Sequence, residues 1–98
     1  MKAVLCHGYG TADELRLDDL PQPHPGEGEV VVKVAAAALN FFDTLIIAGK
    51  YQIKPDFPFS PAAEFAGSVH EIGPGVSGWK VGDRVLSYAS FGAAREYV

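Results

Sequence analysis

The amino-acid sequence predicts a mainly β domain with one short helix near residues 40–48. Seven prolines and eleven glycines are distributed along the 98 residues and divide the chain into short segments, which is typical of strands and turns. Only one segment combines a helix-capping residue, an apolar face and a terminal glycine. Because 48% of the residues are hydrophobic, a chain of this length can bury one core, and we expect residues 1–98 to form a single domain.

The first third of the chain is predicted to hold two short strands and a loop. Lys2–Cys6 is predicted to be a strand, and Glu14–Leu20 a second, half-buried one, because Leu15 and Leu17 alternate with charged residues. The segment Pro21–Gly28 is rich in proline and glycine, so it is expected to be a loop without ladder hydrogen bonds.

A strand followed by the helix is predicted next. Glu29–Ala38 begins with β-branched residues and ends in alanines, as expected where another element packs close against a strand. Asn40 is a candidate N-cap, Asp43 lies three residues further on, and Gly49 is placed to end the helix. A helix of about nine residues is shorter than the roughly 12 to 15 that an isolated helix needs, so tertiary packing must stabilise it. The apolar face is supplied by Phe41, Phe42, Leu45 and Ile46.

After a loop that contains Pro55, Pro58 and Pro61, the sequence predicts three more strands. They are expected at Ala63–Ile72, Arg84–Tyr88 and Ala93–Val98, with turns at Gly73–Gly78 and Val81–Asp83.

Charge and hydropathy exclude several classes of function. The net charge is −4 and the eight Lys and Arg residues are scattered, so we expect no nucleic-acid partner. The apolar stretch Val30–Leu39 is interrupted by Lys33 and is far shorter than the roughly 20 residues that span a bilayer, so we expect no membrane insertion. The N-terminus lacks the apolar region of a secretory signal, and a single cysteine fits a reducing compartment, so we expect a cytoplasmic protein.

One glycine-rich motif suggests nucleotide binding but is better explained structurally. Gly73, Gly75 and Gly78 spell G-x-G-x-x-G, yet Pro74 and Gly82 interrupt the helix that a dinucleotide-binding fingerprint would have to open. We therefore predict a glycine-rich turn between two strands.

The potential metal ligands are poorly spaced for a metal site. Cys6 and His7 are adjacent and would point to opposite faces of a strand, while His24 lies in the proline loop and His70 in a late strand. We expect three surface histidines, a small apolar thiol and no metal. No G-x-S-x-G motif is present to support a serine hydrolase.

Three blocks of sequence resemble the medium-chain dehydrogenase/reductase superfamily. They are A-A-L-N-F-F-D-T-L-I-I-A-G-K-Y at 37–51, P-F-S-P-A-A-E-F-A-G-S-V-H-E-I-G-P-G-V at 58–76 and G-W-K-V-G-D-R-V at 78–85. With the opening M-K-A-V and the proline loop, the resemblance covers almost the whole chain in order.

The chain differs from the zinc-dependent alcohol dehydrogenases of that superfamily. Where those enzymes place a cysteine and a histidine ligand, this sequence has Asn40 and Ala63, although Glu64 and Gly67 of the same motif are present. The four-cysteine lobe that holds a structural zinc is also missing. Together with Asn40, Asp43 and Tyr51, these differences resemble the zinc-independent quinone oxidoreductase and zeta-crystallin branch.

The resemblance implies a GroES-like, partly open barrel that faces a separate Rossmann domain across an NADPH-binding cleft. It implies hydride transfer to a quinone or other conjugated carbonyl without zinc, in a full-length protein that is a homodimer. Asn40 and Tyr51 are then the candidate catalytic residues, and Asn40, Asp43 and Tyr51 the candidate cofactor contacts. Phe41 and Phe42 are candidates for an apolar wall beside the substrate. No residue is expected to bind a metal. Asn40, Asp43 and the phenylalanines also have a structural explanation: the first two as a helix cap, and the aromatic residues as core.

Two alternatives remain open at this point. The chain could be a stand-alone, non-catalytic GroES-like binding module, because residues that bind nucleotide phosphates are missing from it. Within the enzymes, an enoyl-thioester reductase resembles the same blocks. Residues 1–98 alone are expected to be inactive, because one wall of a cleft cannot hold a cofactor in a reactive geometry.

Overall fold

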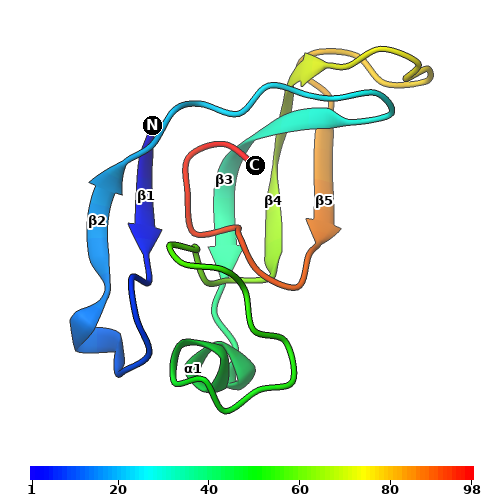
Figure 1. Cartoon of the computed structure of the whole chain (residues 1–98). Coiled ribbons are helices and arrows are strands. Elements are labelled where there is room, and N and C mark those ends of the chain that lie inside the picture. Colours follow the sequence, from blue (N-terminus) through cyan, green and yellow to red (C-terminus); the bar gives the residue numbers. More distant parts are fainter.

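The computed structural model describes all 98 residues as two antiparallel sheets with one short α-helix below them (Figure 1). The smaller sheet pairs β1 (Lys2–Leu5) with β2 (Arg16–Asp19). The larger sheet has the order β3-β4-β5, formed by β3 (Val30–Ala38), β4 (Glu64–Ile72) and β5 (Arg84–Tyr88). The sheets do not close on each other, so the predicted mainly β, partly open GroES-like fold is confirmed.

Burial follows the side-chain alternation on β1 but not on β3, where the adjacent residues Val31 and Val32 are both buried next to a register shift. On β1, Ala3 and Leu5 point into the core, and on the larger sheet Val32 of β3 faces Val69 of β4 in register; all four are buried. The alanines that end β3 are all exposed, although neighbouring residues of a strand point to opposite faces. The larger sheet is therefore buried around Val32 and Val69 and open at the end near α1.

The helix α1 (Phe41–Ile47) follows β3 directly and confirms the predicted helix to within one or two residues. Asn40 is the N-cap with extended backbone angles, and Gly49 has a φ of 72°, the left-handed conformation that glycine adopts without strain. Ile46 and Ile47 bury themselves against Cys6 and Phe59. This cluster, and not intrinsic propensity, holds a helix of only seven residues.

The prediction of a strand at Ala93–Val98 was wrong. This segment lies between the two sheets and changes partner along its length: the N–H of Val4 on β1 donates to the carbonyl of Ala94, while Val32 on β3 exchanges two hydrogen bonds with Val98. Only isolated bridges result, because neither strand offers it a continuous ladder. The start of the predicted strand Glu14–Leu20 also differs, since a 3-10 turn occupies Ala12–Glu14 and β2 begins at Arg16.

The G-x-G-x-x-G segment forms a turn, as predicted. Gly73 donates its N–H to the carbonyl of Glu29, Gly28 donates to that of Pro74, and no helix follows. This turn lies at the opposite end of the larger sheet from α1 (Figure 1). It therefore lies far from the end of the sheet where α1 and the residues around it gather.

Candidate functional site

The candidate site lies where β3 ends, α1 begins and β4 begins. Antiparallel pairing places Ala38 opposite Glu64, so the last residue of β3 faces the first residue of β4. The carboxamide nitrogen Nδ2 of Asn40 donates to Oε1 of Glu64 at 2.9 Å. A carboxylate only accepts hydrogen bonds, so this contact fixes the nitrogen end of the Asn40 carboxamide toward β4.

Asp43 holds the backbone around this pair. Its Oδ2 accepts the N–H of Asn40 at 2.8 Å, and its Oδ1 accepts the N–H of Ala62 at 3.0 Å. Ala62 is completely buried and has a φ of 73°, a conformation that costs a non-glycine residue on the order of 1 kcal/mol. The buried Asp43 carboxylate therefore fastens the start of α1 to a strained loop immediately before β4.

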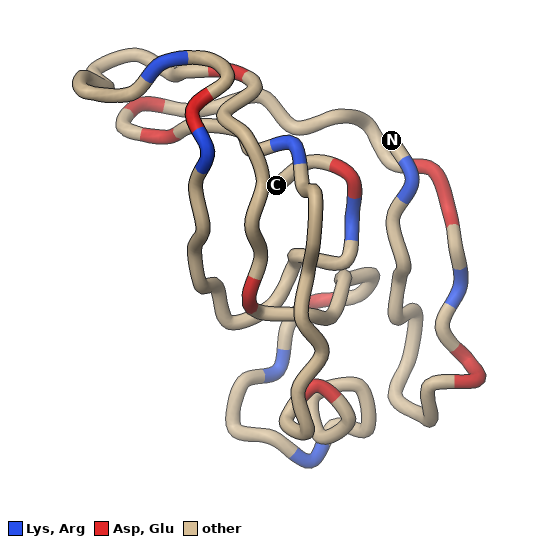
Figure 2. The backbone as a smooth tube through the Cα atoms, turned by 180° about the vertical axis from the view of Figure 1, so that it is seen from behind, with Lys and Arg blue, Asp and Glu red and all other residues tan.

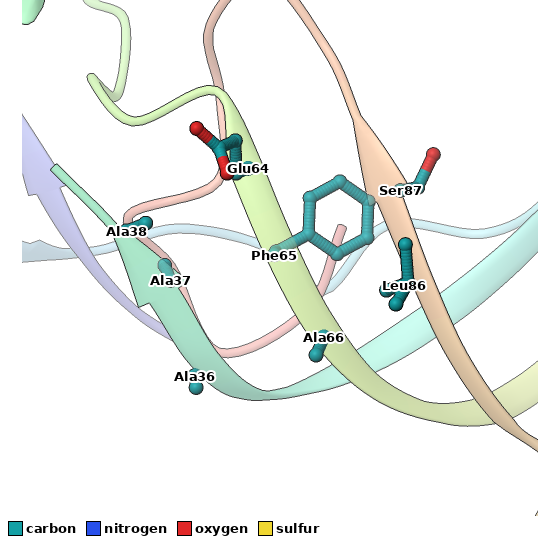
Figure 3. A pocket seen from close by; sticks show the side chains of 8 residues that line it. All are labelled: Ala36, Ala37, Ala38, Glu64, Phe65, Ala66, Leu86 and Ser87. Atoms are coloured by element: carbon teal, nitrogen blue, oxygen red, sulfur yellow. The ribbon is translucent and has the colours of Figure 1, made fainter. Parts of the chain in front are cut away.

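A shallow apolar pocket of about 310 Å³ lies beside Glu64, at the end of the larger sheet near α1 (Figure 3). Small side chains from β3 and β4 leave this space, and Leu86 of β5, which is 83% exposed, forms part of its wall. Asn40 is one hydrogen bond away from the pocket through Glu64. The lining residues are Ala36, Ala37, Ala38, Glu64, Phe65, Ala66, Leu86 and Ser87.

Phe42 of α1 and Tyr51, which follows the helix, lie together elsewhere. Their ring centroids are 5.7 Å apart, and both rings pack against the core cluster of Cys6, Ile46, Ile47 and Phe59. The Tyr51 ring is half-buried, and no hydrogen bond joins its hydroxyl to Asn40 or to any other group of this chain. Phe41, in contrast, is 77% exposed.

The predicted site residues therefore form separate groups. The structure brings Asn40 and Asp43 together at the helix start, and it joins Phe42 to Tyr51 and to the core. Glu64 was absent from the set of candidate site residues predicted from sequence. Its proximity to Asn40 depends on the register of β3 against β4, for which the local sequence carries no signal.

The potential metal ligands are dispersed. His7 pairs with Asp18, His24 with Glu71, and the exposed ring of His70 lies 3.1 Å from Gln22. The prediction of three surface histidines is confirmed.

Cys6 is buried in the core, and this burial raises the pKa of its thiol. Nowhere in the chain do three or more His, Cys, Asp or Glu side chains gather around one point. At the two positions that resemble the zinc ligands of alcohol dehydrogenases, the carboxamide of Asn40 and the methyl group of Ala63 do not fit a zinc ion, which prefers thiolate and imidazole.

Charged residues are found in most parts of the chain, but the end of β3 and most of β5 carry none. Lys and Arg residues lie apart from one another along the sheets and loops, with acids between them (Figure 2). None of the helices is long and apolar enough to cross a membrane.

Comparison with known proteins shows similarity over the whole chain. Residues 26–98 match the family model described as the alcohol dehydrogenase GroES-like domain. The chain is 35% identical over 91 residues to a quinone oxidoreductase of Rattus norvegicus, covering 92% of this chain and 28% of that protein.

Two solved structures show the same architecture. The human synaptic vesicle membrane protein VAT-1 homolog-like protein superposes with a TM-score of 0.95 at 36% identity, covering 100% of this chain and 32% of that chain. The Escherichia coli quinone oxidoreductase complexed with NADPH superposes with a TM-score of 0.92 at 31% identity, covering 100% of this chain and 30% of that one. The chain thus spans about a third or less of the length of these relatives.

Proposed function

The chain belongs to the alcohol dehydrogenase GroES-like domain family, and from this we propose that it is the substrate-side domain of an NADPH-dependent reductase that acts on quinones or other conjugated carbonyls without zinc. The observation that carries the proposal is the Asn40–Glu64 pair beside an apolar pocket. The pocket suits a flat, apolar ring, since an apolar cavity of roughly 150 Å³ already holds benzene. The carboxamide of Asn40 beside the pocket can donate a hydrogen bond to an oxygen on that ring.

The proposal assigns a polar role to Asn40. One N–H of its carboxamide is occupied by Glu64, and the second remains available as a donor. When NADPH is bound, it supplies the hydride, and negative charge develops on the substrate oxygen. A pre-positioned N–H donor stabilises that charge without reorganising during the reaction, which is the role that Asn40 would have in place of a metal.

The other predicted residues have supporting roles in this proposal. Tyr51 would offer its free hydroxyl to the nicotinamide end of the cofactor, while Asp43 keeps the helix start and Asn40 in place. Phe41 is exposed and would form an apolar wall against the substrate, and Phe42 would hold the Tyr51 ring from behind.

The remainder of the enzyme would lie outside these residues. The G-x-G-x-x-G segment is a turn and the basic side chains are dispersed, so a second, Rossmann-type domain would have to bind the cofactor phosphates. We propose that the full-length protein is a cytoplasmic homodimer, as the resemblance to quinone oxidoreductases suggests.

The first experiment is to measure the intact mass of the native polypeptide in its source cell. A polypeptide longer than these residues by one or two domains is expected, and a native chain that ends near Val98 would contradict the enzyme and favour a non-catalytic binding module.

The longer polypeptide is then tested for oxidation of NADPH with a quinone, an enone and an enoyl thioester, before and after treatment with a zinc chelator. We expect quinone or enone turnover that survives chelation and falls about a hundredfold in Asn40→Ala. Turnover with the enoyl thioester alone would assign the alternative reductase activity, and turnover lost on chelation would overturn the zinc-independent mechanism.

A further inference from the structure

The side chain of Glu64 is the charged group that forms a hydrogen bond with the carboxamide of Asn40, the candidate catalytic group. It is exposed, lies in register with Ala38 at the end of β3, and accepts a hydrogen bond from Nδ2 of Asn40 at 2.9 Å. No basic side chain pairs with it: the ion pairs of the chain join Lys2 to Asp19, His7 to Asp18 and His24 to Glu71. The carboxylate of Glu64 therefore has Asn40 as its hydrogen-bond partner.

The hydrogen bond to Glu64, together with the capping box in which the Asn40 side chain faces the N–H of Asp43, decides which end of the carboxamide is which. An asparagine side chain can rotate by half a turn and exchange its nitrogen and oxygen at little cost unless a partner distinguishes them. The carboxylate of Glu64 attracts the carboxamide nitrogen of Asn40 and would repel its oxygen. If the carboxamide rotated by half a turn, this hydrogen bond would be lost and two acceptors would face each other. The amide nitrogen is consequently held at the end of the sheet where the apolar pocket lies.

We propose that Glu64 is a positioning residue for the reductase: it selects the rotamer of Asn40 in which the second N–H faces a carbonyl oxygen of the substrate seated over Ala36–Ala38 and Leu86. This inference rests on the proposed function. It adds that the ring of the substrate lies in the pocket whose lining side chains Figure 3 shows, and that its oxygen points toward the start of β4. Glu64 acts through Asn40 and does not itself contact the reacting atoms.

The proposal predicts a specific pattern among variants of the native polypeptide. Glu64→Ala is expected to lower kcat/KM for the quinone or enone about tenfold, because the amide loses its orienting partner, whereas Glu64→Gln is expected to lose about threefold or less, since its amide oxygen still accepts. The matched control is Glu71→Gln, the same change at the other end of β4, where the side chain pairs with His24; it is expected to leave kcat/KM unchanged.

A double-mutant cycle separates positioning from a structural or direct role. In the Asn40→Ala background the change Glu64→Ala should have no further effect on kcat/KM, because there is no amide left to orient. An effect of Glu64→Ala that persists at tenfold in that background would overturn the proposal. So would a fall in Tm of more than a few degrees on Glu64→Ala alone, because an exposed pair contributes little to stability.

A second measurement does not depend on activity. Asn40 is the only asparagine in the sequence, so asparagine-selective ¹⁵N labelling of the 98-residue chain gives one side-chain NH₂ pair. We expect the proton that bonds to Glu64 to lie downfield of its position in a free carboxamide, and to move upfield in Glu64→Ala but not in Glu71→Gln. A pair that is unaffected by Glu64→Ala would overturn the orientation of Asn40, whereas this upfield shift without any reductase activity would retain the orientation and reject the proposed function.

Discussion

At the scale of single residues, one buried carboxylate organises the candidate site. Asp43 is only 5% exposed, and its two carboxylate oxygens accept hydrogen bonds from the backbone N–H groups of Asn40 and Ala62. These two residues are 22 positions apart in the chain. Asn40 is therefore supported twice, through its backbone by Asp43 and through its side chain by Glu64. Sequence spacing predicts the contact with Asn40, whereas the contact with Ala62 appears only in the folded chain.

Replacing Asp43 with Ala should destabilise the domain strongly. The buried N–H of Ala62 would lose its only acceptor in a strained conformation, and the helix would lose its cap, so the free energy of unfolding should fall by about 3 kcal/mol. Denaturant unfolding measures this change, and Asp83→Ala, which removes a more exposed carboxylate from the N–H of Lys80, should cost about 1 kcal/mol or less. Equal losses in the two variants would contradict the role of Asp43.

Replacing Tyr51 with Phe should separate packing from chemistry. The ring would keep its contact with Phe42, and the hydroxyl has no partner within the chain, so Tm should stay unchanged. If the hydroxyl contacts the cofactor or the substrate, turnover or NADPH affinity of the native polypeptide should fall about three- to tenfold. Unchanged steady-state kinetics and cofactor affinity would leave Tyr51 as a packing residue only.

At the scale of elements, the geometry of the site depends on how β3 pairs with β4. The register shifts near Val34–Ala36, where an irregularity in β3 lies opposite Gly67 of β4. A Cβ added to Gly67 would lie 2.0 Å from the carbonyl oxygen of Lys33, so only glycine permits this approach. The shift sets the side of the sheet on which Ala38 and Glu64 lie, and thereby the partner of Asn40.

Gly67→Ala should therefore disrupt the larger sheet. The added methyl group meets backbone atoms that cannot move without breaking the β3–β4 ladder, and we expect a loss of about 3 kcal/mol in the free energy of unfolding. Gly8→Ala is the matched control, because no atom lies within 4 Å of the added Cβ there, and its effect should stay within about 0.5 kcal/mol. A Gly67→Ala variant as stable as this control would show that the close approach is not required.

At the scale of the whole molecule, the chain exposes more surface than its mass requires. Its accessible surface is 6088 Å², whereas a monomer of 10.4 kDa typically exposes roughly 5400 Å². Large apolar side chains such as Leu39, Leu86 and Tyr88 contribute to this surface, and they surround the end of the sheet where Asn40 lies. This exposed apolar surface agrees with the proposal that one wall of a cleft is present and its opposite wall lies outside these residues.

The isolated 98-residue chain is expected to be inactive. It contributes an amide donor and an apolar pocket but no cradle for nucleotide phosphates, so NADPH cannot be held in a reactive geometry. NADPH oxidation with a quinone should stay at the background rate, and titration with NADPH should show no saturable binding at micromolar concentration. Robust NADPH-dependent turnover by this chain alone would refute the need for a second domain.

Local sequence was sufficient for much of the architecture. Asn40, Asp43 and Gly49 set the bounds of α1, because caps act within a few residues, and the β-branched run at Val30–Val34 determined a strand, because such side chains favour extended backbone. The glycine-rich turn at Gly73–Gly78 followed in the same way, from residues that tolerate positive φ.

Tertiary structure alone decided three other features. It broke the expected strand at Ala93–Val98 into bridges, because that segment must serve two sheets at once. The tertiary structure packs Phe42 and Tyr51 against the core cluster, and it places Glu64 next to Asn40, although 24 positions separate them in the sequence. These outcomes depend on strand register and on contacts between distant segments, whose free energies are set by the packed whole and are not encoded in any local pattern of residues.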